Sequence, residues 1–134
     1  MRLIKSSFIA LWFVTASSVL AADCQTVPKY AEPHVSGIVI QKWLGEIQGS
    51  KEVECRKLGG NVLQCFKDVE IWLFTELGHP AHPAMSHAAL IDCNVQTYIS
   101  RNGYYAGNQK AFDTWFSELK KYDEDTIRRF RQAQ

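Results

Sequence analysis

The amino-acid sequence predicts an α+β fold: a small antiparallel sheet with an N-terminal helix and one or two C-terminal helices, held by two disulfides. Between residues 53 and 101, short segments are rich in β-branched and aromatic residues, which favours strands. Apolar residues recur at helical spacing before and after this region. Four cysteines in a short exported chain indicate two bridges. We expect the helices to be segregated to one face of the sheet.

The segment 1–22 has the organisation of a cleavable signal peptide. Two basic residues precede the apolar run 8–14, and small residues then lead to a cleavage point after Ala21 or Ala22. The apolar run is shorter than the ~20 residues that a membrane-spanning helix needs. We therefore expect export to the periplasm or the medium, a single mature domain of residues 23–134, and no membrane span after processing.

An extended arm and a helix come first in the mature chain. Residues 23–33 are polar and contain two prolines, which favours an extended segment. Ser36 is a helix cap, and apolar residues at imperfect helical spacing continue up to Gly49. The sequence therefore predicts a helix between these two residues.

A β-hairpin is predicted next. Two arms with alternating apolar residues flank Gly59-Gly60-Asn61, residue types that tolerate the positive φ of a tight turn. A three-residue loop places Cys55 opposite Cys65, so we expect a disulfide between them. The remaining pair, Cys24 and Cys93, would then tie the N-terminal arm to the sheet.

Three more strands complete the predicted sheet. The segment VEIWLFT, 69–75, is rich in β-branched and aromatic residues and favours a core strand. Two prolines exclude a regular helix or a central strand in 79–87, which is expected to be a loop or an edge. Residues 85–92 and 94–101 have strand patterns, and Asn102-Gly103 is a turn signal.

The C-terminal part is predicted to be helical. Asn108 is a good helix cap, and apolar residues at positions 112, 115, 116, 119 and 122 share one helical face. Three acidic residues from Asp123 to Asp125 begin a second, short helix. Three arginines lie toward its end, which suits the helix dipole.

Charge and composition exclude some partners. The chain has 15 Lys and Arg against 14 Asp and Glu, and removal of Arg2 and Lys5 with the leader gives a net charge of about −1. Phosphate contacts need clustered cations, and the only cluster lies in 128–131. We expect no nucleic-acid partner.

The candidate binding surface combines a histidine-proline loop with a pair of tyrosines. His79, His82 and His87 lie within nine residues, and Tyr104 and Tyr105 stand between two glycines, where we expect a loop or a strand end. Tyrosine joins a large apolar ring to a polar tip and is common in binding surfaces. The alternative is that one of the two tyrosines closes the edge of the core.

The same histidines form a candidate metal site. Imidazole is a good ligand for zinc and copper, so His79, His82 and His87, with or without His34, could bind a transition metal. Prolines hold two of these histidines in extended geometry, and the cysteine spacings match no zinc knuckle. No cofactor is therefore expected, and zinc or copper is the alternative.

A small envelope hydrolase is the third interpretation. Ser86 stands beside His87, and Glu76 and Asp92 are nearby acids. The chain has no nucleophile elbow, no glycine-rich phosphate cradle and no paired carboxylates at helical spacing. We assign no catalytic residue.

Two quoted patterns carry a resemblance. WLFTELGHPAHPA, followed by GYYAGNQKAFDTWF, resembles small exported bacterial proteins of uncharacterised function. In those proteins a strand ending in Phe-Thr runs into a Gly-His-Pro-Ala-His-Pro loop, and a Tyr-Ala-Gly turn opens a helix with Ala-Phe and Trp. The resemblance covers 69–116 and implies a bacterial envelope protein, without an activity or catalytic residues.

Together these observations predict a non-enzymatic protein that binds another protein or an envelope component. The most concrete version is an inhibitor or immunity protein that blocks a toxin or a cell-wall-degrading enzyme, an expectation that follows from small size and compartment.

Overall fold

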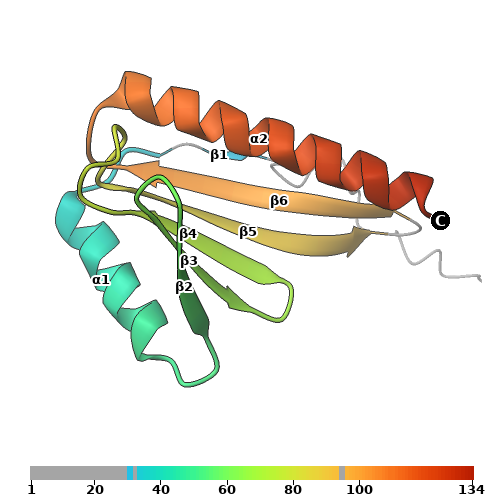
Figure 1. Ribbon diagram of the computed structural model, residues 1–134, viewed down its shortest axis with the longest axis horizontal. Helices are drawn as coiled ribbons and strands as arrows, with labels where there is room; N and C mark the ends of the chain where they lie inside the picture. Colours follow the sequence, from blue (N-terminus) through green and yellow to red (C-terminus); the bar gives the residue numbers. More distant parts are fainter. Residues whose placement is uncertain (1–29, 32, 94–95) are drawn as a thin grey trace, which may run out of the picture.

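The computed structural model describes residues 30–31, 33–93 and 96–134, and it has the predicted α+β architecture (Figure 1). Five strands form an antiparallel meander, and the two-residue β1 pairs in parallel with β6, which gives the order β1-β6-β5-β4-β3-β2. The elements are β1 (Tyr30–Ala31), α1 (Gly37–Gly49), β2 (Glu54–Leu58), β3 (Val62–Lys67), β4 (Glu70–Thr75), β5 (Ala84–Cys93), β6 (Gln96–Tyr105) and α2 (Gln109–Gln132).

The two helices lie on opposite faces of the sheet. Neighbouring residues on a strand point to opposite faces, and Leu73 and Phe74 of β4 are both buried. Leu73 belongs to the cluster of buried side chains that includes α2, whereas Phe74 belongs to the cluster that includes α1. The expectation that both helices share one face was wrong. Strand β4 carries apolar side chains on both faces, so both faces must be shielded from water. α2 packs on one face and α1 on the other.

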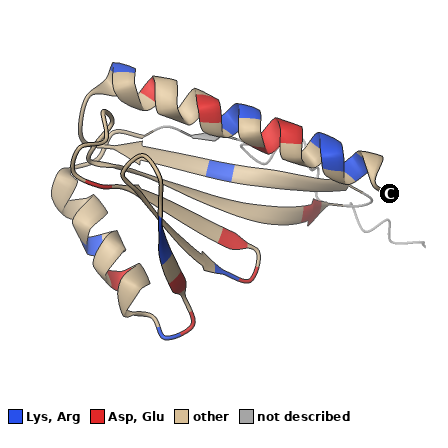
Figure 2. Ribbon diagram, in the orientation of Figure 1, with Lys and Arg blue, Asp and Glu red and all other residues tan. Residues whose placement is uncertain are grey.

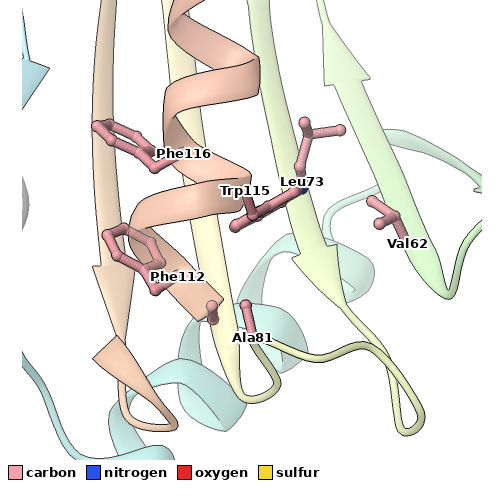
Figure 3. Close-up of a cluster of buried hydrophobic side chains, with 7 residues drawn as sticks. Val62, Leu73, Ala81, Phe112, Trp115 and Phe116 are labelled. Carbon is pink, nitrogen blue, oxygen red and sulfur yellow. The ribbon is translucent and has the colours of Figure 1, made fainter. Parts of the chain in front are cut away.

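α2 is one continuous helix of 24 residues. Asn108 caps it as predicted, because its side chain accepts a hydrogen bond from the backbone N–H of Ala111 at 2.9 Å. Its apolar face buries Phe112 and Phe116 against the sheet (Figure 3), and acidic and basic residues are interleaved along the helix (Figure 2). The prediction of a second, short helix beginning at Asp123 was wrong. Asp123 lies inside α2, where its side chain is buried and forms an ion pair with Arg101 of β6.

The predicted turn at Asn102-Gly103 was also wrong, because both residues lie inside β6. Gly103 pairs with Ser86 of β5. A Cβ atom on Gly103 would lie 2.5 Å from Phe116 Cε2 and 2.7 Å from Phe112 Cζ. The glycine is therefore required for the close approach of α2 to the sheet, because a larger residue would clash with the helix.

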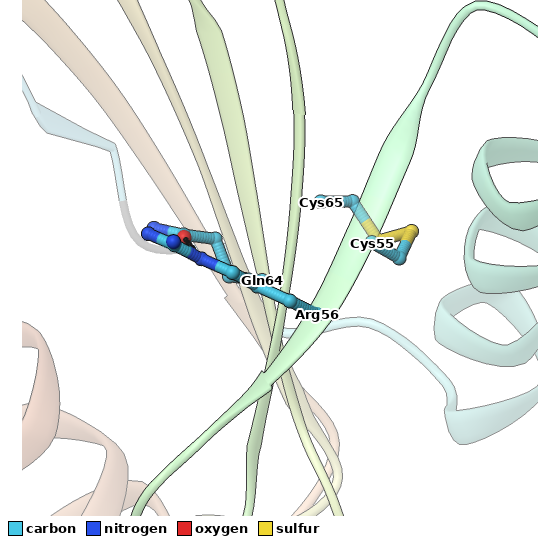
Figure 4. Close-up of a disulfide and its surroundings, with 4 residues drawn as sticks. All are labelled: Cys55, Arg56, Gln64 and Cys65. Atoms are coloured by element: carbon cyan, nitrogen blue, oxygen red, sulfur yellow. Dashed lines mark hydrogen bonds between the residues drawn. A yellow bond between two sulfur atoms is a disulfide. The ribbon is translucent and has the colours of Figure 1, made fainter.

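The predicted hairpin register is confirmed. Gly60 and Asn61 have φ of 75° and 59° in the turn, and Cys55 pairs with Cys65 in the ladder and forms a disulfide with it. Figure 4 shows this disulfide on one face of the hairpin, and Arg56 and Gln64 on the other. Arg56 Nε donates a hydrogen bond to Gln64 Oε1 at 2.7 Å.

The predicted signal peptide, 1–22, and Cys24 lie outside the described residues. Cys55–Cys65 is the bridge seen in the described part of the chain, and Cys93 is not a free thiol. The pairing of Cys24 with Cys93 stays a prediction. Neither described helix has both the length and the apolar character of a membrane span.

The histidine-proline loop joins β4 to β5 and is shorter than predicted. β5 begins at Ala84, directly after the last proline, because the chain regains its backbone donors there. Thr75 Oγ1 accepts a hydrogen bond from the Ala84 N–H at 2.8 Å. His82 Nδ1 lies 2.9 Å from the Thr75 carbonyl oxygen, which can only accept, so Nδ1 is the donor. The His82–Pro83 peptide bond is cis.

Candidate functional site

A cleft with a volume of about 300 Å³ opens between α1 and the sheet. This volume is at the lower end of the range for small-ligand sites. Its walls come from α1 and from strands β4, β5 and β6, and its lining residues are Trp43, Glu46, Ile47, Trp72, Met85, His87 and Tyr104.

Strand register assembles the sheet side of the cleft. Met85 pairs with Tyr104, and His87 pairs with Trp72. Met85 and His87 are two positions apart on β5 and therefore share a face. Trp43 approaches from α1 and meets the Tyr104 ring edge-on, with 4.8 Å between the ring centroids. Residues from four elements far apart in sequence thus form one aromatic hollow.

The imidazole of His87 is held by a ring and a carboxylate. It stacks on Trp72, with ring centroids 5.1 Å apart and planes 13° apart. Its Nε2 lies 3.0 Å from Glu70 Oε1. A carboxylate accepts hydrogen bonds when ionised, so this contact favours a proton on Nε2. Both side chains of the pair remain partly exposed at the rim of the cleft.

The carboxylates at this cleft are not matched by basic lining residues. Glu46 lines the cleft, Glu70 stands at its rim, and no lysine or arginine among the described residues lines it. Lys42 Nζ lies 3.9 Å from Glu46 Oε1, but the side chains are 72% and 61% exposed, so this ion pair is weak. Lys67, the ladder partner of Glu70, forms an ion pair with Glu52, which is the main cause of its raised pKa, and Glu70 contributes a smaller part of that shift. The cleft is therefore aromatic and acidic.

His79 borders a different hollow, with a volume of about 420 Å³, beside α2. Its ring meets Trp115 edge-on at 5.4 Å, and its Nδ1 accepts a hydrogen bond from the Ala81 N–H at 3.0 Å. Burial lowers the pKa of His79 below its usual value; nearby His82 lowers it further, and Glu118 opposes both effects. His79 is thus packed as a neutral ring at the edge of the core.

The predicted binding surface is divided by the fold. His87 and Tyr104 share the cleft, whereas His79 lies at the other hollow. His82 is hydrogen-bonded to Thr75 at the end of β4. Tyr105 points to the opposite face from Tyr104, stacks on Phe112 at 4.8 Å and packs against the core under α2. It closes the core edge, as the alternative interpretation expected of one tyrosine.

The residues considered for catalysis do not meet. Ser86 and His87 are neighbours on β5 and point to opposite faces. Ser86 is fully buried, and its Oγ accepts a hydrogen bond from Arg101 at 2.5 Å. The two acids are bonded elsewhere, Glu76 to Lys57 and Asp92 to Thr97.

Sequence reasoning missed a buried ion pair on the α2 side. Arg101 donates from Nε and Nη2 to the two carboxylate oxygens of Asp123, at 2.6 and 2.8 Å. The side chains are 4% and 3% exposed. A signal existed, because Asp123 lies seven residues after Phe116 and so falls on the apolar face of the helix.

Within the described residues, no group of three or more His, Cys, Asp or Glu side chains is arranged to hold a metal ion. The transition-metal site at His79, His82 and His87 therefore gains no geometric support and stays a prediction of the sequence.

The chain matches no protein-family model, no curated protein and no solved structure.

Proposed function

We propose that this chain is a small periplasmic or secreted binding protein of the bacterial envelope, and that the cleft between α1 and the sheet is its recognition site. One observation carries the proposal: Trp43, Trp72 and Tyr104 surround a single open hollow and remain partly exposed there. Tryptophan and tyrosine dominate binding energies at interfaces, because they bury a large ring while losing little conformational entropy.

The partner that fits best is another protein. A compact exported domain with a disulfide-linked hairpin offers a rigid frame, and a rigid frame lowers the entropy lost on association. An inhibitor or immunity protein that blocks a toxin or a cell-wall-degrading enzyme is the specific form we propose. In this role the cleft receives a side chain that projects from the partner.

Affinity capture tests the recognition site. The full chain with a C-terminal tag is used to capture proteins from an envelope extract, in parallel with Trp43→Ala and Tyr104→Ala. We expect the partner retained by the wild-type chain to be lost from both variants. Tyr122→Ala is the matched control, because Tyr122 is an aromatic residue of α2 that is 61% exposed and lies outside the cleft.

A third cleft variant distinguishes loss of binding from misfolding. Glu46 is exposed on α1, so Glu46→Phe should occlude the cleft while leaving the core intact. Circular dichroism and thermal melting confirm folding before capture. If all three cleft variants retain the partner as well as Tyr122→Ala does, the cleft is not the recognition site.

Mass spectrometry of the natural product tests export. We expect an amino terminus at residue 22 or 23, and an intact Met1 would overturn the proposed location.

A further inference from the structure

We infer that the cleft between α1 and the sheet binds a positively charged side chain of the partner, and specifically an arginine. This inference rests on the proposed function, because it names the chemical group that the same cleft recognises. It comes from the combination of aromatic walls with two carboxylates that no lysine or arginine of the described lining neutralises.

The aromatic walls favour a cation. Trp43, Trp72 and Tyr104 line the hollow, and the face of an aromatic ring carries negative potential that attracts ammonium and guanidinium groups. Tryptophan is the strongest of these rings. One such contact strengthens binding by about fivefold at an exposed site and by about thirtyfold when water is excluded.

The charges favour the same class of ligand. Glu46 lies in the lining and Glu70 at the rim, and neither is neutralised by a lysine or arginine of the lining. Lys42 competes for Glu46, but at 3.9 Å and with a highly exposed side chain it can be displaced. A bound anion would instead meet two carboxylates, and no lysine or arginine of the described lining would offset their repulsion.

Arginine fits better than lysine. Its guanidinium group is planar, so it can stack on an indole while it donates hydrogen bonds to a carboxylate at its edge. The cleft supplies both kinds of partner, indole rings in its lining and the carboxylates of Glu46 and Glu70. His87 already covers one face of Trp72, so Trp43 is the indole on which we expect the guanidinium to stack. Arginine is also among the residues most enriched at the energetic centres of interfaces.

The test uses N-acetyl-arginine methylamide as the probe and its citrulline counterpart as the control. Citrulline has nearly the same shape and no charge. Binding is followed through the indole N–H signals of Trp43 and Trp72 by NMR at constant pH. Trp115 is an internal reference, because it lies in the core on the α2 side of the sheet (Figure 3).

We expect the arginine probe to shift the Trp43 and Trp72 signals and to leave Trp115 unchanged, and the citrulline probe to bind at least about fivefold more weakly. Glu46→Gln and Glu70→Gln should each weaken arginine binding by about two- to fivefold. Glu124→Gln, at an exposed α2 position outside the cleft, should have no effect. Higher salt should also weaken binding, because exposed charges are screened.

Equal binding of the two probes, the same affinity in both Glu→Gln variants, or no response to the arginine probe would overturn this inference. The capture experiment separates the two proposals. If capture depends on Trp43 and Tyr104 but not on Glu46 and Glu70, the cleft is the recognition site and its ligand is not a cation. If capture depends on none of them, the proposed function fails.

Discussion

Replacing Asp123 with alanine leaves a guanidinium group buried without its counter-ion. The Arg101 and Asp123 side chains are 4% and 3% exposed, and two hydrogen bonds of 2.6 and 2.8 Å join them. After the substitution, the Arg101 side chain keeps its hydrogen bond to Ser86 but loses both bonds to the carboxylate. Breaking a buried pair in this way typically costs about 3–5 kcal/mol. A domain is stable by only about 5–15 kcal/mol, so we expect a large fraction of the stability to be lost.

Urea unfolding followed by circular dichroism measures the change in the free energy of unfolding. Asp125→Ala is the matched control, because it removes the same charge from the same helix. Asp125 is paired with Arg128, whose side chain is 67% exposed. An exposed pair of this spacing contributes about 0.5 kcal/mol or less.

A double variant separates an unpaired charge from lost packing. Arg101→Met combined with Asp123→Leu removes both charges and keeps an apolar contact, so its stability should lie close to that of the wild type. The reasoning is refuted if Asp123→Ala destabilises the chain no more than Asp125→Ala does, or if the double variant is as unstable as Asp123→Ala.

Three further predictions concern packing, pH and the disulfide. Gly103→Ala should destabilise the chain by about 1–3 kcal/mol in urea, because its Cβ meets two phenylalanine rings; Gly45→Ala, with open space around it, should instead stabilise α1 by about 1 kcal/mol. Acidification should lower the urea midpoint. The pKa of His79 is lower in the folded state than its ordinary value of 6.5, so the unfolded chain binds the proton more tightly. The stability that the neutral ring contributes is therefore present above pH 6.5 and is lost as the pH falls through the folded-state pKa. His79→Gln should show a shallower dependence of the urea midpoint on pH, and an identical profile would contradict this cause. Removing the bridge between Cys55 and Cys65, which are ten residues apart, by a double serine substitution should cost about 3 kcal/mol, and an unchanged midpoint would show that the hairpin does not depend on it.

Features that depend on neighbours in the chain were predicted well. The turn residues between β2 and β3 determined the register that pairs Cys55 with Cys65, because positive φ at two consecutive positions leaves few ways to join the strands. The caps at Ser36 and Asn108 marked the helix starts, because their side chains satisfy backbone donors only a few residues away.

Features that depend on distant packing were not predictable in the same way. Asn102-Gly103 has the composition of a turn, but the rings of α2 press on Gly103 and require the missing side chain. Asp123 has the composition of a helix start, but Arg101 lies beneath it on β6. In each case the residue type also favours the local structure that was predicted, but a contact with a residue far away in sequence determines its position in the fold.

The candidate site likewise combines features that the sequence predicts with features that depend on tertiary packing. The sequence by itself proposed His87 and Tyr104 among its candidate binding residues, predicted the β-hairpin and its cysteine pair, and placed a helix before and after the sheet. Only the tertiary structure decided that these two residues belong with Trp43 and Trp72, while Tyr105 serves the core on the other face. The physical reason is that strand alternation sends adjacent side chains to opposite faces, and strand order together with the placement of each helix determines what they meet there.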